Sequence, residues 1–248
     1  MKMKIEIHTL AHQQIELVPY VMRHYQGWAE VRAYGGYSTD GTEELLEKLG
    51  AKIIFLETHN EANDKIFLDM KNNCWKGSKA DWVIVTDFDE LVHHRISVPE
   101  YLKKSDCTLI RPLQYEMYSD FFPTEDKQIT ELIKTGARGS CKFNTFRPSE
   151  ITEMNFDAGC HMAHPTGNVI IDDYFQDMPL ATPITDDAIM TLHYRNLSKD
   201  YVYHRNEYTA SRLSEINKKM GWGTFVYCTR KEVSDYYDMI MKSVTKFL

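Results

Sequence analysis

The sequence predicts an α/β protein with a mostly parallel sheet, helices on both faces of the sheet, and a smaller mixed region beside it. Three observations indicate this class. Strand-like and amphipathic helical segments alternate five times in the first part of the chain. Some of the strand-like segments are almost wholly apolar, as in strands covered on both faces. After about Arg111 the alternation ends, and aromatic, His, Gly and Pro residues become scattered.

The bulk composition suits one large globular domain. The 248 residues are 43% hydrophobic and 26% charged. The net charge of −7, without a basic stripe, disfavours a nucleic-acid partner. The five cysteines form no CxxC pair and are odd in number, which indicates free thiols. Because no apolar run reaches the roughly 18 residues of a spanning helix and no signal peptide is visible, we expect a soluble, cytoplasmic protein without a transmembrane segment.

The first predicted strand runs from Lys4 to Leu10. The segment from Gln13 to Tyr25 has apolar residues at helical spacing. Pro19 lies near the start of this segment, where it fits a first helical turn better than a kink. Glu30 to Tyr34 is a second short strand.

A turn from Ser38 to Glu44 opens the next helix, with Asp40 as its predicted cap. This helix is expected to end at Gly50, because glycine is a common residue just after a helix. The strand from Ala51 to Leu56 is almost wholly apolar. We therefore expect this strand to be covered on both faces.

Two further strands complete the regular part. Ile66 to Cys74 has the spacing of an amphipathic helix and leads into a strand that begins at Trp82. Ser97 and Pro99 open another helix, and Cys107 to Ile110 is a fifth strand. A parallel sheet with helices on both faces follows from this order.

The later part of the chain is less regular. We expect 111–183 to form the smaller mixed region, packed against the first part and not folded as a separate domain. Helical spacing returns from Ser198, and Val233 to Phe247 is predicted to close the chain as a helix. The predicted halves, 1–112 and 113–248, would thus form a single integrated domain.

The stretch from Trp82 to Glu90 is the strongest candidate site. A β-branched run ends there in three carboxylates, Asp87, Asp89 and Glu90. Because side chains alternate along a strand, Asp87 and Asp89 can point the same way. Two close carboxylates repel unless a proton or cation lies between them, and oxygen ligands suit magnesium or manganese. An acidic turn that closes a buried strand and caps the next helix explains the stretch equally well.

Other strand ends should face the same crevice, because ligands of open α/β sheets bind beyond the carboxyl ends of the strands. Thr9 lies at the end of the first strand and Gly35-Gly36 at the end of the second. Such a crevice could hold a nucleotide next to a metal. The G-x-S-x-G, P-loop and G-x-G-x-x-G motifs are absent, which disfavours serine acyl transfer, P-loop chemistry and dinucleotide redox.

Three blocks of the chain match one family pattern. Leu17–Tyr25, LVPYVMRHY, is similar to an early helix that reads roughly LLPYFLRHY. Tyr34 with 38–42, STDGT, resembles a YDN-x-STDGT segment. Asp81–Leu91, DWVIVTDFDEL, resembles DWVIVxDxDEF, in which the aspartate-x-aspartate is a metal motif. The chain therefore resembles the GT-A-fold, Rossmann-like glycosyltransferases, in the family 2-like group of bacteria and phages.

Two weaker blocks extend the resemblance. Phe146–Pro148, followed by Gly159–His161, is similar to a mid-chain RP…G-x-H pattern. His193–Ser198 resembles the HY-x-x-x-S segment that follows it. Together the blocks span most of the chain. The resemblance implies that 1–112 binds a nucleotide sugar and that 113–248 forms the acceptor side.

Carried over by position, the resemblance implies a metal site. Asp87 and Asp89 would lie at a Mn²⁺ or Mg²⁺ ion and the donor's diphosphate, with Asp89 as the direct ligand of the ion. His193 would match a late histidine that can complete such a site. Lys65 could meet a phosphate, although a solvated helix lysine explains it as well. The residues expected at the donor nucleotide are Thr9, Gly35, Asp40, Lys65 and Asp87.

The chain also departs from the family pattern. The early NE of the family falls on Gln13-Gln14, and the DN after the second strand falls on Gly35-Gly36. An acidic residue that often contacts the nucleotide base is thereby missing. The two glycines would instead let the backbone approach a nucleotide closely.

The resemblance implies a metal-dependent, hexosyltransferase-like enzyme that moves a sugar from a nucleotide-diphosphate donor to a glycan or other hydroxyl acceptor. An inverting enzyme needs a carboxylate that deprotonates the acceptor, and Asp157 and Glu153 are the candidates for this catalytic role. An exposed loop acid explains each of them as well, and a retaining enzyme needs no such base.

Two alternatives stay open. A non-catalytic glycan- or nucleotide-binding protein of the same fold is compatible with the departures at Gln13-Gln14 and Gly35-Gly36. A sugar-nucleotide pyrophosphorylase-like enzyme usually has a Gly-rich basic loop after its first strand. That position reads Thr9–Gln13, TLAHQ, without glycine or arginine.

Overall fold

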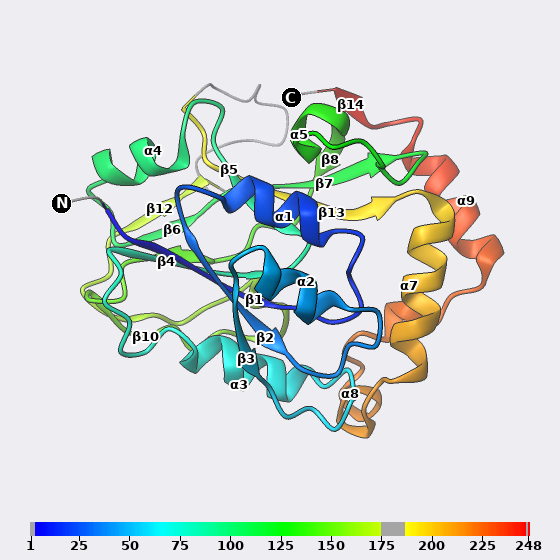
Figure 1. The fold of residues 1–248 in the computed structure, drawn as a ribbon, viewed down its shortest axis with the longest axis horizontal. Coiled ribbons are helices and arrows are strands. Elements are labelled where there is room, and N and C mark those ends of the chain that lie inside the picture. Colours follow the sequence, from blue (N-terminus) through cyan, green and yellow to red (C-terminus); the bar gives the residue numbers. More distant parts are fainter. Residues whose placement is uncertain (1–2, 175–186, 247) are drawn as a thin grey trace.

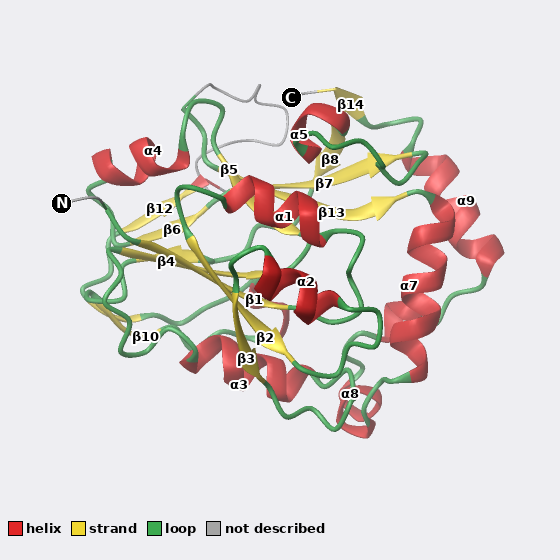
Figure 2. Cartoon of the chain, viewed as in Figure 1, coloured by secondary structure: helices red, strands yellow, loops and turns green. Residues whose placement is uncertain are grey.

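The computed structural model describes residues 3–174, 187–246 and 248, and its strands form two main sheets (Figures 1 and 2). The first sheet has, in spatial order, β12 (Ile171–Asp173), β6 (Leu109–Arg111), β9 (Thr145–Phe146), β4 (Trp82–Asp87), β1 (Ile5–Leu10), β2 (Glu30–Gly35) and β3 (Lys52–Phe55). The second sheet has β14 (Thr245–Lys246), β8 (Thr135–Arg138), β7 (Leu113–Ser119), β13 (Met190–Leu197) and β5 (Glu90–His93). A separate pair is formed by β10 (Ile151–Glu153) and β11 (Thr166–Gly167).

The first sheet is mostly parallel, which confirms the predicted α/β class. The pairs β1–β2, β1–β4, β2–β3 and β6–β12 are parallel. The short strand β9 lies antiparallel between β4 and β6. A strand from the irregular later part of the chain therefore separates two groups of parallel strands.

Several helices lie where they were predicted, but the first helix begins at Val18 and not at Gln13, and the last helix ends at Ile240. Pro19 lies in the first turn of its helix, as expected. Asp40 accepts hydrogen bonds from the backbone N–H of Thr42 at 3.0 Å and of Ile15 at 3.1 Å, although Gly41 occupies the cap position itself. The helices are α1 (Val18–Tyr25), α2 (Thr42–Lys48), α3 (Asp64–Asn73), α4 (Val98–Lys104), α5 (Ile129–Leu132), α7 (Lys199–Ser211), α8 (Glu215–Met220) and α9 (Arg230–Ile240), with 3₁₀ turns η1 (Ala158–Cys160) and η2 (Thr224–Val226).

Alternation along β4 builds a core on each face of the first sheet. Trp82 and Ile84 belong to the core that also contains buried residues of α1, α2 and α4. Val83 and Val85 belong to the opposite core, against which Leu68 of α3 packs. Helices therefore cover both faces, as predicted.

The third strand and the last helix differ from their predictions. The strand at Ala51–Leu56 was expected to be covered on both faces, but β3 is the edge strand of its sheet and Phe55 is 62% exposed. Ile53 and Ile54 are only partly buried as well, so this apolar run is not covered on both faces. The closing helix α9 ends at Ile240, and Phe247, its predicted end, lies outside the described residues, as does part of the predicted mixed region, 175–183.

The two predicted halves share both sheets. Strand β5, from 1–112, belongs to the second sheet, whereas β9 and β12, from 113–248, belong to the first. The chain passes from one sheet to the other directly after β4, through Phe88 and Asp89. The acidic stretch therefore lies at the corner between the sheets.

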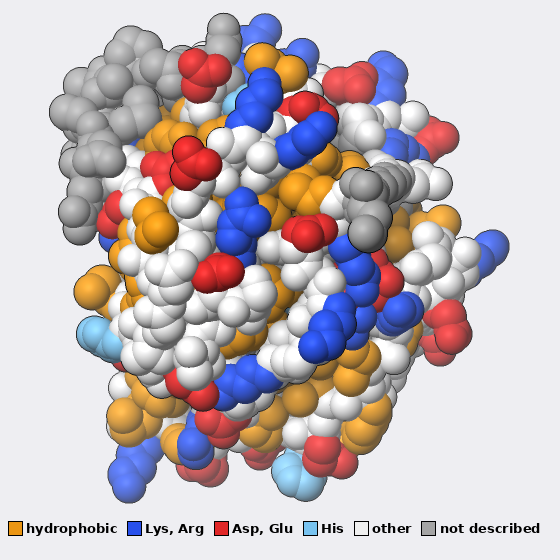
Figure 3. All heavy atoms as spheres, turned by 90° about the vertical axis from the view of Figure 1, so that its left-hand side faces the viewer, with side chains coloured by type: hydrophobic (Ala, Val, Ile, Leu, Met, Phe, Trp, Pro, Cys, Tyr) orange, Lys and Arg blue, Asp and Glu red, His pale blue; other side chains and the backbone are white. Residues whose placement is uncertain are grey.

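The exterior is mixed in character. Figure 3 shows basic, acidic and apolar side chains interspersed over the face that lies at the left of Figure 1. Among the described residues, no helix has both the length and the apolar character that crossing a bilayer requires.

One hydroxyl group joins the last helix to the second sheet. Tyr237 of α9 is buried, and its hydroxyl lies 2.7 Å from the carbonyl oxygen of Asn196 and close to that of Ser119. It also accepts a hydrogen bond of 3.1 Å from the backbone N–H of Ser198. Asn196 and Ser119 lie near the ends of β13 and β7, so this group fixes α9 against both strands.

We expect Tyr237→Phe to lower the free energy of unfolding by about 1–3 kcal/mol, because the change leaves buried backbone groups without a partner. Chemical denaturation measures the loss. Tyr227→Phe is the control, since that side chain is 54% exposed. Equal stability of the two variants would contradict this role of the Tyr237 hydroxyl.

Candidate active site

A cavity of about 1240 Å³ opens beyond the carboxyl ends of β1, β2 and β4. Its volume exceeds the roughly 300–1,000 Å³ that is usual for small-molecule sites. The strand ends contribute Leu10, Gly35 and Asp87. The second sheet and the C-terminal helices complete the wall with Glu116, His193, Arg195, Tyr201, Arg205 and Phe225.

The glycine pair at the cavity mouth is required by packing. Gly36 has a φ of +134°, and a Cβ there would lie 2.4 Å from Cδ2 of Phe55. A Cβ on Gly35 would lie 2.4 Å from the carbonyl oxygen of Ala11. Both glycines line the cavity, so their backbone is accessible to a ligand at this point.

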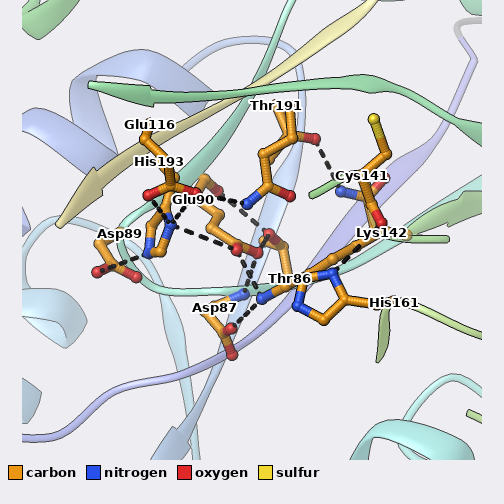
Figure 4. A network of polar contacts seen from close by, with 12 residues as sticks. Thr86, Asp87, Asp89, Glu90, Glu116, Cys141, Lys142, His161, Thr191 and His193 are labelled. Carbon is orange, nitrogen blue, oxygen red and sulfur yellow. Dashed lines mark hydrogen bonds and ion pairs between the residues drawn. The ribbon is translucent and has the colours of Figure 1, made fainter. Parts of the chain in front are cut away.

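Asp87 is held by two buried lysines. Its Oδ1 lies 2.6 Å from Nζ of Lys71 on α3, and its Oδ2 lies 2.7 Å from Nζ of Lys142, which precedes β9. Lys142 also lies 2.6 Å from Oε1 of Glu90, which is fully buried at the start of β5 (Figure 4). One ammonium group therefore bridges the end of β4 and the beginning of β5.

Asp89 is held by two other cations. Its Oδ2 lies 2.5 Å from Nη1 of Arg205 on α7. The same oxygen lies 3.4 Å from Nε2 of His193 (Figure 4). The other ring nitrogen of His193 lies 2.8 Å from Oε2 of Glu116. His193 is in register with Glu90 of β5 on one side and Glu116 of β7 on the other, so the pairing of β13 places it between the carboxylates.

These contacts move the pKa values in opposite directions. Burial favours the neutral form of His193, but Asp89 and Glu116 more than offset it and raise its pKa to about 10. Burial likewise opposes ionisation of Asp87, yet Lys142 and Lys71 lower its pKa. Burial also opposes ionisation of Glu116, but His193 lowers its pKa, so this carboxyl is ionised at neutral pH.

The network leaves little room for a divalent ion. Both oxygens of Asp87 face lysines, and both ring nitrogens of His193 face carboxylates. In the described part of the chain, no three His, Cys, Asp or Glu side chains form a group that could hold a metal. Unit charges about 4 Å apart repel by about 4 kcal/mol at an effective dielectric of about 20, and a divalent ion doubles this. As folded, Asp87, Asp89 and His193 do not fit the expected ion.

The structure brings together five of the nine predicted site residues. Those that line the cavity are Gly35, Asp40, Asp87, Asp89 and His193. Thr9 and Lys65 do not belong to the described lining: Thr9 is buried within β1, and Lys65 pairs with Asp69 at 3.4 Å on the exposed side of α3. Neither side chain is placed to meet a ligand in this cavity.

The two predicted catalytic acids also lie away from the described lining of the cavity. Glu153, on β10, pairs with Lys76 at 2.7 Å. Asp157 is exposed and lies 3.8 Å from Nε2 of His164. Glu116 is the carboxylate that the structure places at the cavity instead.

Sequence reasoning missed Lys71, Lys142, Glu116, Arg195 and Arg205. One of them had a usable signal, because Arg195 follows His193 by two positions in a strand and should share its face. The lysines carry no such signal. Lys71 and Lys142 are 16 and 55 positions from Asp87 in the sequence, and only the fold brings them together.

We expect Lys71→Met to lower the free energy of unfolding by about 3 kcal/mol, because it removes one partner of a buried ion pair. The matched control is Lys65→Met, whose surface pair should contribute about 0–1 kcal/mol. Urea unfolding compares the two variants. Equal losses would show that the contact of Lys71 with Asp87 adds nothing to stability.

We expect opposite charge states for two buried histidines. His193 should be an imidazolium from about pH 5.5 to 8.5, because its folded pKa lies near 10. His8 should be neutral over the same range, because burial lowers its pKa to about 4. Two-dimensional NMR of the ring nitrogens distinguishes the states. A His193 that titrates near its ordinary value would contradict the contacts with Asp89 and Glu116.

Comparison with known proteins adds structural neighbours only. No protein-family model matches the chain, and no curated protein matches its sequence. S. aureus TarS is similar over 84% of this chain and 39% of its own length, at 13% identity and a TM-score of 0.45. Glucosyl-3-phosphoglycerate synthase from Mycobacterium tuberculosis, in complex with Mn²⁺, UDP and glucosyl-3-phosphoglycerate, is similar over 45% of this chain and 44% of its own, at 13% identity and a TM-score of 0.32. The matched regions thus cover less than half the length of either protein, and the similarity is too low to support a function.

Proposed function

We propose that the protein is a glycosyltransferase that moves a sugar from a nucleotide-diphosphate donor to an acceptor hydroxyl. The observation that carries this proposal is the position of the cavity. It opens at the carboxyl ends of β1, β2 and β4, where open α/β sheets bind ligands, and it continues to the cationic wall formed by β13 and α7. A nucleoside would lie at the strand ends, and the charged diphosphate would lie against the cationic wall.

The strand-end side suits the nucleoside. Gly35 and Gly36 expose backbone there, and Tyr37 and Asp40 line the same part of the cavity. A side chain at either glycine would collide with Ala11 or Phe55, so the backbone at this point has to be glycine. Backbone groups and a fixed carboxylate can recognise a base and ribose by hydrogen bonds.

Aromatic side chains of the cavity suit a sugar acceptor. The rings of Phe122 and Tyr201 lie 4.8 Å apart, and both line the cavity with Trp222 and Phe225. Aromatic faces pack well against the apolar faces of sugar rings. Glu116 lies in the same cavity, is ionised, and is oriented by its contact with His193, so it is our candidate for the group that deprotonates the acceptor.

A donor panel tests the proposal. UDP-, GDP-, CDP- and dTDP-sugars are added to the protein, with Mn²⁺ and separately with EDTA, and thermal unfolding is recorded. A bound donor at 100 times its Kd should add about 2.7 kcal/mol of stability. Release of nucleoside diphosphate from the stabilising donor, in the presence of simple sugars, measures turnover. Glu116→Gln should retain donor binding and reduce turnover by about 100-fold or more.

The outcomes separate the alternatives. Donor binding without release of nucleoside diphosphate would favour a non-catalytic nucleotide- or glycan-binding protein. Conversion of the donor by inorganic pyrophosphate into a nucleoside triphosphate would favour a pyrophosphorylase-like activity. If no donor stabilises the protein with or without Mn²⁺, the transferase proposal is wrong.

A further inference from the structure

The carboxylates that a metal would need cannot be released easily. Lys142 bridges Asp87 and Glu90 at 2.7 and 2.6 Å, and Glu90 is fully buried. If Lys142 moved away to admit an ion, Glu90 would become a buried charge without its ammonium partner. The pairing of Asp87 is therefore part of the fold and not a loose contact that a metal displaces.

Arg195, in contrast, is a cation at the cavity that forms no ion pair within the described part of the chain. It lies on β13 and lines the cavity, and Cζ of its guanidinium lies 4.6 Å from the centre of the Phe225 ring. Its Nη2 donates a hydrogen bond of 2.6 Å to Oδ1 of Asn206, a neutral group. Within the described residues, no carboxylate forms an ion pair with Arg195. A partly buried guanidinium thus faces the cavity without a direct ion pair, although Asp89 and Glu116 are near enough to raise its pKa.

A second guanidinium lies beside it. Arg205 on α7 directly precedes Asn206, the residue that holds Arg195, and it also lines the cavity. Burial and Arg205 lower the pKa of Arg195, whereas Asp89 and Glu116 raise it. Asp89 contacts Arg205 through one nitrogen only, at Nη1, and Glu116 contacts His193. Arg195, Arg205 and the His193 imidazolium thus face two carboxylates, which leaves a local surplus of one positive charge.

We infer that Arg195 and Arg205 bind the diphosphate of the donor and supply the positive charge that a divalent ion would otherwise provide. The guanidinium fork matches phosphate oxygens in pairs. Phe225 and Asn206 fix Arg195 in position before the ligand arrives, which reduces the entropy lost on binding. This inference rests on the proposed function, because it assigns the ligand of the same cavity.

The chemical step balances without a metal. The bond between the anomeric carbon and the diphosphate oxygen breaks, and its electron pair stays on that oxygen. The acceptor oxygen forms the new bond to the anomeric carbon, and its proton passes to a carboxylate. The extra negative charge on the leaving diphosphate then lies against Arg195 and Arg205, where guanidinium donors stabilise it.

Inorganic pyrophosphate is the probe, because every nucleotide-diphosphate donor contains this group. Isothermal titration in EDTA should show that the protein binds pyrophosphate without a divalent ion. Arg195→Met should weaken this binding by about tenfold or more, since hydrogen bonds to charged groups are among the strongest in proteins. Arg230→Gln, which removes a positive charge near the protein surface outside the described cavity lining, should leave the affinity unchanged.

A stability measurement separates a binding role from a structural one. Met keeps an apolar contact with Phe225 and removes a charge, but it leaves Oδ1 of the buried Asn206 without its donor. These effects oppose each other, so Arg195→Met should unfold within a few degrees of the parent protein. A clear decrease in the unfolding temperature, with pyrophosphate affinity unchanged, would overturn the inference. Arg195→Lys should recover only part of the affinity, because an ammonium group lacks the planar fork.

A second experiment tests whether the protein binds Mn²⁺ alone. Electron paramagnetic resonance should detect no stoichiometric Mn²⁺ site in the protein without ligand. A 1:1 site that Asp89→Asn removes, together with pyrophosphate binding only when Mn²⁺ is present, would overturn this inference and leave the proposed function standing. If pyrophosphate binds neither with nor without Mn²⁺, both the inference and the proposed function are wrong.

Discussion

The contact of Lys142 with Asp87 and Glu90 is the interaction on which the rest of the site depends. The chain leaves the first sheet at Asp87 and enters the second at Glu90, so two carboxylates lie within one sharp corner. Their repulsion would open this corner unless a cation lay between them. An ammonium group from a distant loop supplies that cation, and the corner that it closes sets the position of one sheet against the other.

The position of the second sheet then determines the chemistry of the cavity wall. Strand β13 pairs antiparallel with β5 and parallel with β7, which places His193 between acidic neighbours on both sides. The register against β7 shifts between His193 and Asn196, and Arg195 lies within this irregular segment. Such irregularities commonly re-aim a side chain near a functional site. The position of Arg195 at the cavity thus follows from how the two sheets are joined.

The sequence revealed features that depend on local pattern and missed those that depend on distance. Strand ends and the Asp87–Asp89 pair follow from periodicity and alternation over a few residues. The partners of these aspartates come from positions up to 116 residues away, on two helices, a strand and a loop that no local rule connects to them. Glu153 and Asp157 were chosen because they precede the turn at His161, but the β10–β11 region places them off the described cavity lining. Proximity in sequence is a poor guide once the chain crosses between sheets.

A carboxylate pair at a strand end is commonly interpreted as a metal site. The charges of the neighbouring side chains, however, decide whether a cation fits there. The four acids Asp87, Asp89, Glu90 and Glu116 face the cations Lys71, Lys142, Arg205 and His193, so the formal charges already cancel. Adding a divalent ion would create a surplus of positive charge inside the protein, on top of Arg195. Adding an anion would reduce the surplus that Arg195 creates. Within this cluster, the charge balance therefore favours a ligand that brings negative charge over one that brings positive charge, and a diphosphate is such a ligand.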